Sequence, residues 1–138
     1  MTLSHADLLA TTRTWLEAWA AHDLEAVLAL MDDEVRFENW TGIAVTGKAS
    51  LRAAWTPWFA DHGNFVFAAE DLFADEASQQ VLLRWSLDWP SQERAHRGQP
   101  EIRRGVDVLR FHEGRIIEKL TYSKTILLIA GRRVGLSA

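Results

Sequence analysis

The stretch GVDVLRFHEGRI, residues 105–116, decides how this chain folds. Its first half is rich in branched and aromatic residues, which predicts a strand, and the tight turn at 112–114 predicts that the chain reverses directly into another strand. Working outward from this hairpin, the same composition between turn-forming segments predicts four long strands, over residues 65–73, 80–89, 102–112 and 115–128. Strands joined in this way are typical of an antiparallel meander.

Helical patterns occupy the first part of the chain. Ser4 and Asp7 have the spacing of a capping box, and the apolar residues from Leu8 to Trp19 recur at helical spacing, so we expect a long first helix. Asp23 is placed to cap a second helix, whose apolar stripe is Leu24, Val27, Leu28 and Met31.

A short strand at 35–39 and a third helix follow. The third helix has an apolar stripe within residues 51–59, and Pro57 should kink or end it. Helices followed by a meander predict an α+β fold in which the N-terminal helices pack on one face of a curved sheet. The length of 138 residues fits a single domain, 1–138, with a core of its own.

Composition excludes several classes of function. The chain has no cysteine, so thiolate nucleophiles and cysteine-bound zinc are excluded, and the five histidines lack paired metal-ligand spacing. The net charge of −4 argues against nucleic-acid binding. No apolar run is long enough for a membrane span, so we expect a cytoplasmic protein without membrane contact. His62 could approach a pocket mouth, although a surface position is the commoner one.

Tryptophan is the most distinctive part of the composition. Seven tryptophans occur in the chain, and several of them stand at helical spacing beside other large apolar residues. Such residues build either a solid core or an aromatic-lined pocket, depending on whether an ionisable group faces the same space. In the strand 80–89, we expect the apolar face with Trp85 to point inward and Arg84 and Asp88 to lie on the outer surface.

Three segments together resemble the nuclear transport factor 2-like superfamily, and its SnoaL-like branch in particular. They are residues 15–27 (WLEAWAAHDLEAV), 33–39 (DEVRFEN) and 105–116. The resemblance implies a cone-shaped barrel with a curved, mixed but mostly antiparallel sheet, and a homodimer. It also implies one of several activities, because this fold hosts isomerases, dehydratases, epoxide hydrolases, cyclases and non-catalytic binders.

The resemblance transfers no complete catalytic set. Asp107 matches the aspartic acid that ketosteroid isomerases use as a hydrogen-bond donor, but Asn39 stands where their base would be and Trp15 where their tyrosine would be. In the limonene epoxide hydrolase pattern, Arg84 matches an arginine, whereas the two aspartates fall near Ser86 and Thr121. SnoaL-like cyclases commonly end the last strand with an aspartate, and Lys124 occupies that position here.

Asp107 remains the strongest candidate from the residues themselves. A carboxyl flanked by valines inside an aromatic cone would be desolvated and could act as acid or base near neutral pH. The resemblance places Lys119 and Thr121 on the same inward face, where Lys119 could pair with Asp107 and merely fix the strand register. Asn39 could orient a water or a carbonyl, or serve only as a turn residue.

We therefore predict a site for a small hydrophobic molecule, with no cofactor and no metal. Its candidate catalytic residues are Asp107 and Asn39. Its predicted ligand-binding residues are Trp15, Trp19, Phe37, Trp55, Phe59, Trp85, Leu109, Lys119 and Thr121. Two functions stay open: a cofactor-free isomerase, dehydratase or cyclase that uses Asp107, and a non-catalytic homodimeric binding or interaction module.

Overall fold

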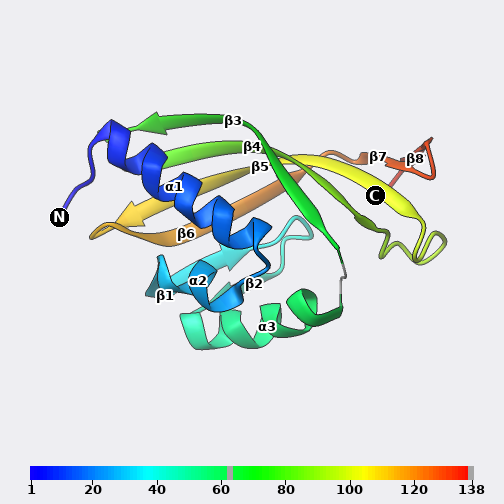
Figure 1. Cartoon of the computed structure of the whole chain (residues 1–138), viewed down its shortest axis with the longest axis horizontal. Helices are drawn as coiled ribbons and strands as arrows, with labels where there is room; N and C mark the ends of the chain where they lie inside the picture. The colour runs from blue at the N-terminus through cyan, green and yellow to red at the C-terminus, as the bar shows by residue number, and fades with distance from the viewer. Residues whose placement is uncertain (62–63, 137–138) are drawn as a thin grey trace.

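The computed structural model describes residues 1–61 and 64–136 (Figure 1). In this part of the chain the first elements are α1 (His5–Ala20), α2 (Leu24–Ala29), β1 (Met31–Glu38), β2 (Ala44–Thr46) and α3 (Lys48–Asp61). They are followed by β3 (Val66–Asp75), β4 (Gln80–Pro90), β5 (Pro100–His112), β6 (Arg115–Ser123), β7 (Ile126–Ile129) and β8 (Arg132–Gly135). The order of helices first and long strands afterwards is the predicted one.

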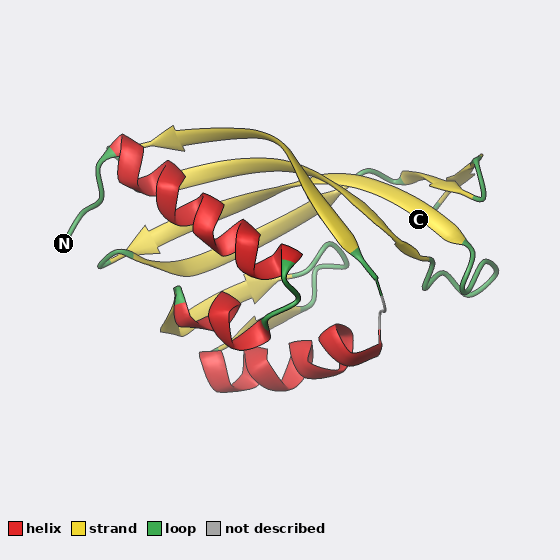
Figure 2. Cartoon of the chain, viewed as in Figure 1, coloured by secondary structure: helices red, strands yellow, loops and turns green. Residues whose placement is uncertain are grey.

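The strands form one mixed sheet with the order β2-β1-β6-β5-β4-β3. Neighbouring strands run antiparallel, except that β1 and β6 pair in parallel. The sheet curls into a half-barrel, and α1 crosses its concave face while α2 and α3 lie over the β1–β2 side (Figures 1 and 2). This is the predicted α+β fold with helices packed on one face of a curved sheet.

The helix caps follow from the sequence. The Ser4 hydroxyl accepts a hydrogen bond from the Asp7 backbone N–H at 3.1 Å, and an Asp23 carboxylate oxygen accepts from the Ala26 N–H at 3.0 Å. Each cap satisfies one of the free N–H groups that begin a helix. None of the helices in the described part combines the length and the apolar character that crossing a membrane requires.

The inward face of β4 is also as predicted. Val81, Leu83, Trp85 and Leu87 are buried, whereas Arg84 is exposed on the opposite face. Helix α1 contacts β3 and β4, and its buried side chains join the inward residues of β4 and β5 in one hydrophobic core.

The predicted second helix is too long. Met31 does not continue α2 but begins β1, where it pairs with Ile116 of β6 and is fully buried. The acidic residues that follow form an irregularity in this pairing, and an Asp32 carboxylate oxygen accepts a hydrogen bond from the Glu34 N–H at 2.8 Å. A bulge of this kind keeps the acidic side chains out of the core while Met31 and Val35 remain inside it.

Two further expectations need correction. The predicted strand 115–128 is divided into β6 and β7, because the chain leaves the strand after Ser123, bends at Thr125, and its second part pairs with the start of β5. Helix α3 does not end at Pro57 but continues to Asp61, and the Thr56 hydroxyl donates a hydrogen bond to the Arg52 carbonyl in the turn before the proline.

Gly105 allows the closest approach in the sheet. It pairs with Trp85 of β4, and a Cβ atom at this position would lie 2.1 Å from the Tyr122 carbonyl oxygen and 2.5 Å from the Trp85 ring. Only a residue without a side chain lets the Trp85 indole lie across β5 at this point.

We predict that Gly105→Ala lowers the free energy of unfolding by about 2 kcal/mol, because the added methyl group forces the Trp85 ring or the β6 backbone to move. Urea unfolding measures the change. Gly135→Ala is the matched control, since a Cβ atom there meets only Ile126 at 3.6 Å, an ordinary contact. Equal stability of the two variants would contradict this account of Gly105.

Candidate functional site

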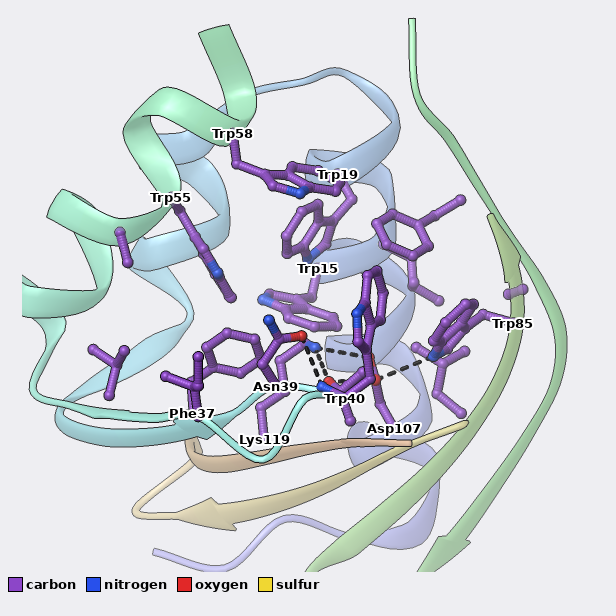
Figure 3. A pocket seen from close by; sticks show the side chains of 18 residues that line it. Trp15, Trp19, Phe37, Asn39, Trp40, Trp55, Trp58, Trp85, Asp107 and Lys119 are labelled. Atoms are coloured by element: carbon purple, nitrogen blue, oxygen red, sulfur yellow. Dashed lines mark hydrogen bonds and ion pairs between the residues drawn. The ribbon is translucent and has the colours of Figure 1, made fainter. Parts of the chain in front are cut away.

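A cavity of about 220 Å³ lies between the helices and the concave face of the sheet (Figure 3). Aromatic side chains from both layers make up most of its wall: Trp15, Trp19, Phe37, Trp40, Trp55, Trp58, Phe67 and Trp85. Smaller apolar residues fill the spaces between the rings, and four polar side chains complete the wall: Asn39, Asp107, Lys119 and Thr121. The site is thus an apolar chamber with a few polar groups, the composition that small-molecule sites share.

The aromatic wall is held by ring contacts between α1 and α3. Trp15 and Trp19 are one helical turn apart on α1, with ring centroids separated by 5.7 Å. Trp19 in turn meets Trp55 of α3 edge-on at 5.0 Å, and Trp55 meets Phe37 of β1 at 5.2 Å. These edge-to-face pairs restrict the rotation of each ring, so the wall keeps its shape without a ligand.

Two indole N–H groups of this wall are unsatisfied. The Nε1 atoms of Trp15 and Trp19 are buried, and neither has a hydrogen-bond partner among the described residues. Buried donors without a partner are uncommon in folded proteins and carry a desolvation cost. Two residues of the wall therefore carry buried donors for which the described part of the protein provides no acceptor.

A buried polar cluster forms the floor of the cavity. Asp107 of β5 stands opposite Thr121 of β6 in the strand register. Lys119 lies two residues before Thr121 on the same inward face of β6. Asp107 Oδ1 accepts hydrogen bonds from Trp85 Nε1 at 3.1 Å and from the Thr121 hydroxyl at 2.8 Å. Its Oδ2 lies 3.3 Å from Lys119 Nζ, which confirms the predicted pair across the hairpin.

Lys119 is the most perturbed group of this cluster. Burial in the cavity wall lowers its pKa from the usual value of lysine, and the nearby Asp107 carboxylate only partly opposes this effect. Nζ also donates to the Thr121 hydroxyl and lies 4.7 Å from the centre of the Phe37 ring. The amine is therefore enclosed by one carboxylate, one hydroxyl and an aromatic face.

Asn39 combines the two roles considered for it. Its backbone N–H donates to the Ile43 carbonyl at 2.9 Å, and its side-chain oxygen accepts from the Trp40 N–H at 2.7 Å, so it is a turn residue. Its side chain nevertheless lies in the cavity wall. The amide nitrogen Nδ2 makes no hydrogen bond to the residues that the structure describes, and it is a third available donor beside the cavity.

Most of the predicted site residues meet around the cavity, and two do not. Phe59 turns away from it and packs on Trp19 and on Phe65, at centroid distances of 5.0 and 5.6 Å. Leu109 is fully buried in the core, one inward position beyond Asp107 along β5 and outside the cavity wall. Both were predicted as site residues because Phe59 shares a face of α3, and Leu109 a face of β5, with residues of the wall. The cavity covers only part of each face. His62 lies outside the described residues.

Sequence reasoning missed three aromatic wall residues: Trp40, Trp58 and Phe67. Trp40 alternates with Phe37 and Asn39 along the strand, which predicts the outer face, but β1 ends at Glu38 and the turn brings the indole inside. The Arg103 guanidinium holds it there, with its carbon 4.3 Å from the centre of the Trp40 ring. The helical spacing of Trp58 from Trp55 indicated that both side chains lie on one face of the helix, but Trp58 was not included among the predicted site residues.

Arg103 belongs to a second buried network beside the cavity. Its side chain lies 3.3 Å from Glu101 Oε2 and 2.8 Å from Glu93 Oε1, and Glu101 also accepts hydrogen bonds from Ser91 and Trp89. The charged groups of this network are paired with one another, and Arg103 links the network to the Trp40 ring in the cavity wall. Among the described residues, no three acidic, histidine or cysteine side chains are close enough to hold a metal ion.

The comparisons with known proteins define the class of this domain. A model of the SnoaL-like domain matches residues 12–119, so the chain belongs to the SnoaL-like family. No curated protein matches the chain.

Solved structures share the fold at low sequence identity. A Mycobacterium tuberculosis protein, RV0760c, in complex with estradiol-17beta-hemisuccinate is 23% identical, with a TM-score of 0.70 over 84% of this chain and 92% of that chain. TerC, co-crystallised with polyporic acid, is 13% identical, with a TM-score of 0.72 over 86% and 92%. A candidate polyketide cyclase from Xanthomonas campestris pv. campestris is 16% identical, with a TM-score of 0.72 over 87% and 92%.

The burial of Lys119 predicts a specific pH dependence of stability. Because its pKa is lowered in the folded state, the unfolded chain binds more protons at this residue just below pH 10.5, the usual lysine value. Stability should therefore rise with pH in that range, by about 1.4 kcal/mol per pH unit where the folded site is neutral and the unfolded one is charged. Urea unfolding of the wild type and of Lys119→Met at several pH values isolates this contribution; parallel curves for the two proteins would contradict it.

Proposed function

We propose that this SnoaL-like domain binds a small hydrophobic molecule in the cavity between the helices and the sheet. The observation that carries the proposal is the preformed aromatic chamber, which has a buried polar floor and unsatisfied donors in its wall. A solid core would leave neither the space nor the donors. Two structural neighbours support the class of ligand, since they contain estradiol-17beta-hemisuccinate and polyporic acid, both ring compounds.

The volume limits the size of the enclosed part of the ligand. A cavity of about 150 Å³ is enough to hold benzene. The 220 Å³ found here therefore suits a compound of one or two rings, and a larger ligand would extend beyond the cavity. Planar rings fit this wall best, because they can pack against its indole faces.

The polar groups favour a ligand with a neutral hydrogen-bond acceptor. Lys119 and Asp107 compensate each other in charge, so the floor has no net charge that would call for an ionic ligand. Asp107 already has three partners, Trp85, Thr121 and Lys119, whereas the indole N–H groups of Trp15 and Trp19 have none among the described residues. A carbonyl oxygen would satisfy such donors, and a purely hydrocarbon ligand would not.

The same contacts bear on the proposed role of Asp107 as acid or base. Both oxygens already have partners, Trp85 and Thr121 at Oδ1 and Lys119 at Oδ2. Direct proton exchange between Asp107 and a ligand would require breaking these contacts. We therefore favour binding over an isomerase, dehydratase or cyclase reaction in which Asp107 itself acts on the ligand.

We also propose that the domain is a homodimer formed through the outer face of the sheet. A band of apolar residues crosses four paired strands on this face: Phe73, Leu82, Val108 and Leu120. Phe73 and Leu82 are exposed, and Arg84, Glu70 and Asp71 beside them supply charges of both signs. A surface with an apolar band and mixed charges can be complementary to itself across a two-fold axis.

Filling the cavity should abolish binding. Ala54 of α3 lines the cavity but is exposed, so Ala54→Phe adds a ring to the ligand space without disturbing the core. We expect the affinity for a bicyclic ketone such as 1-tetralone, measured by quenching of tryptophan fluorescence, to fall at least tenfold, roughly 1.4 kcal/mol. Ala53→Phe is the control, because Ala53 is equally exposed on the same helix but lies outside the wall. Equal affinities of both variants would contradict binding in this cavity.

The dimer has its own test. Leu82→Arg places a charge at the centre of the apolar band and should convert the dimer to a monomer, as measured by light scattering after size-exclusion chromatography. Ala10→Arg adds the same charge to the exposed side of α1 and should leave the dimer intact. A monomeric wild type at micromolar concentration would refute the proposal.

A further inference from the structure

The alignment of the two strands does not explain why Lys119 is buried. Its side chain is only 8% exposed, although backbone pairing already aligns β5 and β6 without interruption from Gly105 to Arg110. Burying an amine and a carboxylate together rarely gains stability over apolar residues of similar size. The pair lies in the wall of a cavity, where a reactive group would be useful, and the fold itself does not require it there.

We propose that Lys119 is a nucleophilic amine that forms an imine with an aldehyde or ketone group of a hydrophobic ligand. The inference rests on the proposed function of the cavity and adds the chemical class of the ligand and a covalent step. Nothing in the proposed binding function alone requires this step, so the two can fail separately.

The position of Nζ fits this role. It lies at the cavity wall, with Thr121 and Asp107 on one side and the Phe37 ring on another (Figure 3). Two of the three N–H bonds of an ammonium group are used by Thr121 and Asp107, and no further hydrogen bond to Nζ occurs among the described residues. The Phe37 ring lies 4.7 Å from Nζ on a further side, and because Lys119 lines the cavity, a ligand would reach the amine along the edge of this ring.

A nucleophilic amine must be neutral when it reacts. Burial lowers the pKa of Lys119, which raises the fraction of neutral amine at a given pH. The Asp107 carboxylate, with its Oδ2 3.3 Å from Nζ, is placed to receive the proton that the amine gives up. Asp107 thus acts on the proton of Lys119, which it already contacts, rather than on a proton of the ligand.

The reaction balances with the groups present. Lys119 transfers one proton to Asp107, and the Nζ lone pair attacks the carbonyl carbon while the carbonyl oxygen takes a proton back, which gives a carbinolamine. The C–O bond then breaks, the oxygen leaves as water with a second proton from nitrogen, and a protonated imine remains. Overall, an ammonium ion and a carbonyl compound give an iminium ion and water, so the charge is unchanged and the ion pair with Asp107 is kept.

The wall also supplies groups for the carbonyl oxygen. Trp15 Nε1 is a buried donor without a partner in the described part of the chain, and for the Asn39 side chain only the oxygen has a hydrogen bond there; both residues line the cavity together with Lys119. Donors placed where negative charge develops on oxygen stabilise the addition step. The nucleophile, its proton acceptor and the donors for the oxygen therefore border one space.

The test is reductive trapping of the wild-type protein with 2-naphthaldehyde and cyanoborohydride near neutral pH, followed by peptide mass mapping. The chain has only three lysines, Lys48, Lys119 and Lys124, so the site of labelling is unambiguous. We expect about tenfold more adduct at Lys119 than at either of the others, because only Lys119 is desolvated beside a bound carbonyl. Lys119→Arg should lose the cavity adduct and Lys124→Arg should keep it.

Fluorescence titration with 2-methylnaphthalene, which cannot form an imine, separates the possible failures. If this compound binds in a manner sensitive to Ala54→Phe but the aldehyde labels the three lysines equally, the imine is refuted and the binding function stands. If neither compound binds and Lys119 is unlabelled, both proposals fail. The distribution of the label among the three lysines of the wild-type protein tests the imine by itself. The test therefore remains valid even if a Lys119 variant does not fold.

Discussion

The contact between Asp107, Thr121 and Lys119 on the concave face of the sheet is the constraint on which the rest of the site depends. It places a carboxylate, a hydroxyl and an amine in a space that is otherwise aromatic. Charges in such a place need partners, and here they find them in each other and in the Trp85 indole. Trp85 can reach Asp107 only because Gly105 leaves room for its ring, so the sheet and the polar floor are built by the same residues.

The helices form the side of the cavity that faces the sheet. α1 and α3 bring rings over the polar floor, and the edge-on contacts among Trp15, Trp19 and Trp55 keep these rings from collapsing onto it. On the other side, the Arg103 network holds Trp40 in the wall. An open chamber lowers the stability of a small domain unless its walls are rigid. The ring contacts and the Arg103 network both supply that rigidity.

Local signals in the sequence were sufficient for the fold. Caps at Ser4 and Asp23, the alternation along 80–89 and the hairpin at 112–114 each predicted an element that the structure contains. The second helix was predicted to include Met31, and a single strand was predicted to run through Lys124. Both errors arose because local periodicity does not show which strand a segment will pair with. For the site, the residues themselves pointed to Asp107, and the family resemblance placed Lys119 and Thr121 on the same inward face. Trp40 was missed because its direction depends on a turn and on Arg103, which is distant in sequence, and Phe59 and Leu109 were included because a shared face does not show where a cavity ends.

The central claim is that the cavity receives a hydrophobic molecule whose oxygen accepts hydrogen bonds from its unsatisfied indoles. The seven tryptophans give seven indole N–H signals in a proton–nitrogen correlation spectrum, and titration with 1-tetralone would follow each of them. We expect the Trp15 or Trp19 signal to move downfield as it gains a partner, while that of Trp85, already bonded to Asp107, moves less. Unchanged Trp15 and Trp19 signals at saturating ligand would contradict the account.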